Sequence, residues 1–138
     1  MGYAHTVTVA LPYATAVTRI KELLGEQGFG ILTEIDLRAT FEAKLGPDSA
    51  AALGDYLILG ACNPVLAQKG LTAEPELGLL LPCNVVVRRP ADSAVTVVET
   101  IDPNTMVQLS EAPAIQAVAD AANSRLLAAL DGLTDTAA

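Results

Sequence analysis

Several kinds of residue are scarce in this sequence, and each scarcity argues against a class of function. Tryptophan is absent and aromatic residues make up 4% of the chain. The aromatic platforms of sugar sites and of single-strand nucleic-acid sites are therefore poorly supplied. The chain has one histidine, His5, which we expect to be exposed and idle. A Ser-His-Asp or Cys-His mechanism needs a base beside its nucleophile, so a hydrolase of that type would depend on this residue alone.

Positive charge is also scarce, and it is scattered. Eight Lys and Arg residues stand against 16 Asp and Glu residues, which gives a net charge of -8. Nucleic-acid binding requires clustered cations that displace counterions, and the only adjacent pair is Arg88 and Arg89. We therefore expect neither a nucleic-acid partner nor binding to an anionic membrane, and the acidity favours a soluble protein.

Long apolar runs are missing. The longest run, 77–87, contains Pro82 and Asn84 and has about 11 residues, whereas a membrane-spanning helix needs roughly 20. The N-terminus lacks the basic segment and long apolar stretch of a signal peptide. The sequence therefore predicts a cytoplasmic protein whose two cysteines stay reduced.

Apolar residues are plentiful enough to build a core, because they form 51% of the 138 residues. The length is that of one domain, and no repeat, linker or low-complexity tract divides the chain. We expect a single domain over residues 1–133, with a frayed tail at 134–138.

The spacing of the apolar residues predicts alternating strands and helices. Strands are expected at 6–10, 31–37, 55–62, 77–88 and 95–101. Helices are expected at 13–27, 39–45, 65–69 and 112–130, with Gly28, Gly46 and Gly70 just past three of them. Segment 77–88 is apolar throughout, so we expect it to be buried on both faces.

The resulting order is β-α-β-α-β-α-β-β-α, and the last two strands are joined by a connection short enough for a hairpin. This order predicts the α+β class, with a single mainly antiparallel sheet of about five strands and helices packed largely on one face. A doubly wound parallel sheet is the alternative. The absence of a glycine-rich phosphate loop weighs against it.

Candidate chemistry lies around two cysteines that are each followed by an asparagine. Cys62 ends a predicted strand, and Asn63 and Pro64 supply a helix start, with Asn as the N-cap and Pro at the first helical position. Unpaired N–H groups and the positive end of the helix dipole stabilise a thiolate at such a place. Cys62 is therefore either a reactive thiol or a small buried residue at a strand-to-helix corner.

The second cysteine, Cys83, follows Pro82 within an apolar segment. Proline marks an edge or a bulge, and a bulge can aim a side chain at a pocket; core packing is the alternative. The amide of Asn84 either fixes a local turn or faces a polar site, because burying it unpaired costs on the order of 1–3 kcal/mol. If the two strands are neighbours, the thiols could form a disulfide, a redox pair or two ligands of a metal. We expect no metal, since zinc sites generally need four ligands.

Five pieces of the sequence together resemble the family catalogued as domain of unknown function 302. They are Thr-Val before Leu11-Pro12, GFGILTEID at 28–36, ILGACNP at 58–64, EPELGLLLPCNVVV at 74–87, and Ile101-Asp102-Pro103 followed by Met106. The resemblance implies an α+β fold of the TATA-binding-protein-like group, no DNA binding, and a homodimer. It carries over no reaction, because fold does not determine function. The residues that match the family's motif are Cys62, Asn63, Cys83, Asn84 and Asp102.

We therefore predict a small-ligand-binding or interaction module that acts as a homodimer, with those five residues in its ligand site and with no cofactor or metal. The lack of a catalytic set and the long apolar segment, which can line a pocket, support this hypothesis. The alternative is a thiol-dependent redox or sulfur-transfer protein, with Cys62 as the more reactive thiol and Cys83 as its partner. A purely structural domain is a third hypothesis. Whether the protein is an enzyme stays open, and its candidate catalytic groups are these two thiols.

Overall fold

The chain folds into one antiparallel sheet of five strands with helices around it, as a computed structural model that describes residues 2–137 shows. The strands lie in the order β1 (Ala4–Val9), β5 (Thr96–Ile101), β4 (Cys83–Arg89), β3 (Asp55–Cys62) and β2 (Gly30–Asp36). Every neighbouring pair is antiparallel. The predicted α+β class and the antiparallel sheet are confirmed.

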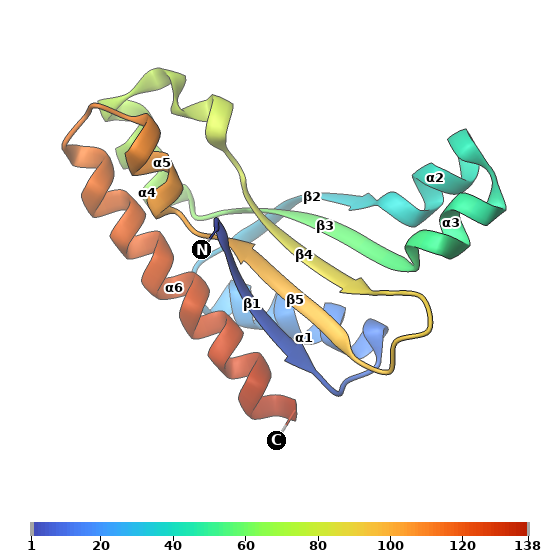
Figure 1. Ribbon diagram of the computed structural model, residues 1–138. Coiled ribbons are helices and arrows are strands. Elements are labelled where there is room, and N and C mark those ends of the chain that lie inside the picture. The colour runs from blue at the N-terminus through green and yellow to red at the C-terminus, as the bar shows by residue number, and fades with distance from the viewer. Residues whose placement is uncertain (1, 138) are drawn as a thin grey trace.

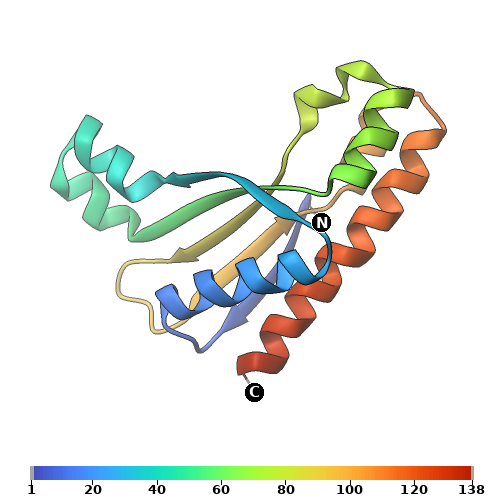
Figure 2. The ribbon, with the colours of Figure 1, turned by 180° about the vertical axis from the view of Figure 1, so that it is seen from behind.

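Two helices cover one face of the sheet. Helix α1 (Tyr13–Glu26) and helix α6 (Ala114–Ala137) pack against each other and lie behind the strands in Figure 1 and in front of them in Figure 2. Their apolar stripes meet the inward side chains of β3, β4 and β5, as the helical period predicts. The fully buried members of this core include Ile20, Leu24, Leu59, Val85, Val87, Val98, Leu126, Leu130 and Leu133.

Within residues 2–137, no helix lies over the centre of the opposite face of the sheet, and Figure 1 looks onto that face. We call it the open face. Asn84 is exposed there, and Tyr56, Ile58 and Val86 are half-buried. The expectation that segment 77–88 is buried on both faces was therefore wrong. An antiparallel sheet can leave one face to water, and an apolar run does not reveal which face that is.

Helices stand at both ends of the open face. Helices α2 (Leu37–Leu45) and α3 (Pro47–Leu53) pack on each other at one end and form what we call the arm. Helix α4 (Pro64–Ala73), the 3-10 helix η1 (Pro75–Leu80) and helix α5 (Asn104–Leu109) lie at the other end. Helices thus flank the open face at two ends and leave its centre uncovered.

The edge strand β2 is the most exposed of the five. Its register against β3 shifts between Ile31 and Thr33, which marks a bulge. All its side chains except that of Ile31 are exposed.

Two predicted elements differ from the structure between residues 64 and 83. Helix α4 does not end at Gly70 but continues to Ala73, and residues 75–80 form η1 instead of the first half of a strand. The glycine at position 70 serves close packing and not the end of a helix, because a Cβ at this position would lie 2.6 Å from Cδ2 of Leu77. Gly70 lets η1 approach α4, whereas Gly28, with a φ of 86°, does end α1 as predicted.

Helix α6 also extends further than expected. It runs to Ala137, through residues that the sequence analysis assigns to a frayed tail, and Ala138 lies outside the described residues. Leu133 continues the apolar stripe and is fully buried, so the last turns are held by the core. Within residues 2–137, no helix is both long and apolar enough to cross a bilayer.

The extended α6 predicts that Leu133→Ala lowers the free energy of unfolding by about 2–5 kcal/mol, because the substitution leaves a cavity in the core. The matched control Leu127→Ala removes the same atoms from a side chain of the same helix that is 36% exposed, and should cost about 1 kcal/mol or less. Urea unfolding followed by far-UV circular dichroism measures both. Equal losses would contradict the burial of the C-terminal turns.

Candidate functional site

The five residues carried over by the resemblance fall in three places. Cys62, Asn63 and Cys83 line one small cavity where the sheet meets α4 and α6. Asn84 lies in a wide groove on the open face. Asp102 precedes α5 and lines neither hollow, although its backbone N–H donates a 2.7 Å hydrogen bond to the carbonyl of Tyr3, which lines the groove.

The two cysteines lie on neighbouring strands and line one cavity, but they are not paired across the ladder. Ala61 is directly opposite Cys83 in the β3–β4 ladder, so these two share a face of the sheet. Successive side chains alternate between faces, so the Cβ of Cys62 is directed to the other side. The cavity that both residues line has a volume of about 30 Å³, which is room for about one water molecule. It is too small for a metabolite.

Both thiols are free, and Cys83 is poorly suited to nucleophilic work. Burial raises its pKa to about 11, and the neighbouring Cys62 thiol adds to the rise. The thiolate is the reactive form of cysteine, so Cys83 stays protonated and inert near neutral pH.

Asn63 uses its amide to hold the backbone in place. Its Oδ1 accepts a hydrogen bond from the N–H of Leu66 at 3.3 Å, which confirms the predicted N-cap of α4. Its Nδ2 donates to the carbonyl of Gln27 at 3.4 Å, and Arg125 donates to the same carbonyl. The side chain therefore ties the start of α4 to the end of α1.

Asp102 has a similar local role. Its Oδ1 accepts a hydrogen bond from the N–H of Asn104 at 2.9 Å, at the start of α5. The same oxygen lies 3.8 Å from Nε2 of His5, which forms a 2.7 Å hydrogen bond with Oδ1 of Asn123. The expectation of an exposed, idle His5 was wrong: the ring is half-buried between β1 and α6.

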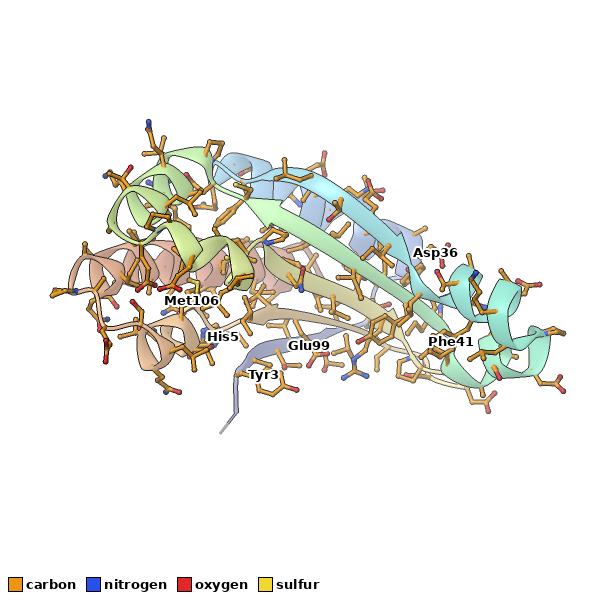
Figure 3. All side chains as sticks on the ribbon, turned by 90° about the horizontal axis from the view of Figure 1, so that it is seen from above. Tyr3, His5, Asp36, Phe41, Glu99 and Met106 are labelled. Atoms are coloured by element: carbon orange, nitrogen blue, oxygen red, sulfur yellow. The ribbon has the colours of Figure 1, made fainter. Side chains whose placement is uncertain are left out.

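A much larger hollow lies on the open face. This groove has a volume of about 650 Å³, within the range of about 300–1,000 Å³ of small-molecule sites. Figure 3 shows Tyr3 and Glu99 beside each other on this side of the sheet. The lining residues with polar side chains are Tyr3, Tyr56, Asn84, Glu99 and Thr100, and the side chain of Thr100 is buried.

Glu99 is held firmly in the groove. Its Oε1 accepts a 2.7 Å hydrogen bond from Nε of Arg88, and its Oε2 accepts a 3.0 Å hydrogen bond from Oγ1 of Thr6. The bond from Arg88 is the main cause of a lowered pKa, which burial partly offsets. The carboxylate is therefore ionised and oriented at neutral pH. A carboxylate has about four acceptor sites, so it can accept further hydrogen bonds.

The sequence analysis did not select Tyr3, Tyr56 or Glu99. For Glu99 the local pattern gave no clear signal, because its neighbours on the same side of β5, Val97 and Ile101, are apolar, whereas Thr96 and Thr100 on the other side are buried. A strand whose outward side is mostly apolar does not stand out as the lining of a polar site. No group of three or more His, Cys, Asp and Glu residues in the described part of the chain could hold a metal ion.

The raised pKa of Cys83 predicts slow reaction with a thiol reagent. At pH 8, a pKa of about 11 instead of the ordinary 9.0 lowers the thiolate fraction roughly hundredfold. We expect Cys83 in the native Cys62→Ser variant to react at least that much more slowly than the denatured variant. Absorbance of a released chromophore measures the rate, and equal rates would contradict the burial.

The comparisons with known proteins agree with this architecture. The sequence model of the family described as "Domain of unknown function DUF302" matches residues 5–133. The crystal structure of an uncharacterised conserved DUF302 protein from Bacillus stearothermophilus superposes with a TM-score of 0.84 at 28% identity, over 96% of this chain and 98% of that one. A search of curated proteins finds no match. Since the matched region covers most of the chain, the protein belongs to the DUF302 family.

Proposed function

We propose that the protein is a small-ligand-binding module whose site is the groove on the open face, and that it acts as a homodimer. The observation that carries the first part is the combination of a metabolite-sized hollow with a fixed carboxylate, Glu99, and an exposed amide, Asn84. Ligand sites combine apolar walls with a few placed polar groups. The apolar lining here comes from Val86 and Ile101.

The distribution of aromatic residues supports this location. The chain has five aromatic side chains in total, three Tyr and two Phe, and two of the tyrosines line this groove. Tyrosine offers a large flat surface together with a polar group. A chain so poor in aromatic residues thus places two of them at one hollow that is open to solvent.

A binding screen by NMR tests the site. The ¹⁵N-labelled protein is mixed with pools of organic acids, amines, sugars and nitrogen heterocycles. We expect at least one pool to shift the side-chain amide signals of Asn84 while those of Asn123, on the helix-covered side, stay in place. The variant Asn84→Ala assigns the signals. If no pool shifts Asn84, or if every pool shifts both amides equally, the groove is not a ligand site.

The arm is the proposed interface of the homodimer. Leu37, Phe41 and Leu45 recur at every fourth residue of α2, so they form one apolar stripe. Helix α2 buries no residue within its own chain, and Leu45 is 63% exposed. A second copy is a suitable cover, because the arm carries balanced charge, with Arg38 paired to Asp55 at its base. Two chains of net charge -8 repel least where their surfaces are locally neutral.

Sedimentation equilibrium tests the dimer. We expect the wild type at about 50 μM to have twice the mass of one chain, and Leu45→Glu to be a monomer, because it buries a charge in the contact. The matched control is Leu109→Glu, which alters a side chain that is 70% exposed at the other end of the sheet, and it should stay a dimer. A monomeric wild type, or a dimer that survives Leu45→Glu, would exclude this interface.

The alternative use of Cys62 and Cys83 in redox or sulfur transfer has one supporting observation, the cavity that the two residues share. The alternation of side chains and the raised pKa of Cys83 count against direct exchange between the thiols. The reactivity measurement above decides the matter, since fast modification of native Cys83 would favour the thiol hypothesis.

A further inference from the structure

We propose that the groove on the open face takes a flat nitrogen heterocycle that bears N–H donors and no phosphate or carboxylate group. This inference rests on the proposed ligand-binding function and names its ligand class.

Hydrogen-bonding capacity gives the first argument. Glu99 is an acceptor whose position is already set by Arg88 and Thr6, so a ligand does not have to order it. Asn84 offers both N–H donors and a carbonyl acceptor. Glu99 lies opposite Val86 across the β4–β5 ladder, and Asn84 is two residues before Val86. The two side chains are therefore diagonal neighbours roughly 7–8 Å apart. A fused ring with N–H groups and ring nitrogens along its rim can reach both.

Shape gives the second argument. Tyr3 comes just before β1, at one edge of the sheet, and Tyr56 comes from β3, two strands beyond β5. Both line the same groove. Tyr3 is 67% exposed, so its ring is available to a ligand. Flat aromatic surfaces favour flat partners, which stack on them. The other wall residues named above are aliphatic and suit the faces of a ring.

Charge gives the third argument. Glu99 is ionised, and the residues that the structure describes in the lining include no Lys, Arg or His. The neighbouring cation Arg88 already donates to Glu99. The chain as a whole carries a net charge of -8. A phosphate or carboxylate in the groove would therefore meet the like charge of Glu99, and the neighbouring cation Arg88 is already paired with that carboxylate. An uncharged or protonated heterocycle would meet no such repulsion.

Adenine and adenosine 5′-monophosphate form a suitable pair of probes, because they share the ring and differ in the phosphate. Titrations of the full chain follow the Asn84 amide by NMR. We expect adenine to saturate the shift with a dissociation constant of about 1 mM or lower. The monophosphate should bind at least about tenfold more weakly, because it brings like charge to Glu99.

Two variants and one control assign the effect to the groove. Glu99→Gln and Tyr56→Leu should each weaken adenine binding at least about tenfold, through loss of a charged acceptor and of a stacking surface. The control Glu34→Gln alters another strand carboxylate with a cationic partner, Lys21, on the helix-covered side of the sheet. It should change binding by less than about twofold. Dispersed amide spectra establish that each variant is folded.

The outcomes separate this inference from the proposed function. If the monophosphate binds as tightly as adenine, or if Glu99→Gln leaves adenine binding unchanged, the ligand class is wrong. If pools without heterocycles shift Asn84 and adenine does not, the groove remains a ligand site and the inference about heterocycles fails. If no compound shifts Asn84, both fail.

Discussion

Successive side chains of a β-strand point to opposite faces of the sheet, and every site in this protein follows from that constraint. The helices α1 and α6 bury one set of side chains, among them Leu59, Val85 and Val98. The intervening residues are left on the open face, where Asn84 and Glu99 line the groove. By the same alternation it is Ala61, and not Cys62, that shares a face with Cys83 across the paired strands.

Much of the fold could be predicted, because it depends on local signals. The helical stripe of α1, the left-handed Gly28 and the start of α4 at Asn63 and Pro64 were all confirmed. Tertiary packing decided what the sequence could not show. In the sequence, Gly70 resembles the end of a helix, and only the structure shows that Leu77 packs against it. An apolar run such as 77–88 likewise does not indicate which face of the strand is buried.

The candidate site was harder to predict than the fold. The motif of the resemblance selects residues with local structural roles, such as the cap at Asn63 and the turn at Asp102. The groove instead gathers Tyr3, which precedes β1, Tyr56 of β3 and Glu99 of β5, which are remote in sequence, and only the sheet order brings them together. The TATA-binding-protein-like grouping, the cytoplasmic location and the absence of a nucleic-acid partner stay predictions.

The exposed edge strand β2 has a consequence for the behaviour of the protein in concentrated solution. An unprotected edge offers its free backbone groups to another chain, which is a common beginning of aggregation. Here the bulge between Ile31 and Thr33 interrupts the regular spacing of those groups, and the carboxylates of Glu34 and Asp36 follow at once. Irregular spacing and charged side chains make the strand a poor template, so the sheet can end in water at this edge without recruiting a sixth strand.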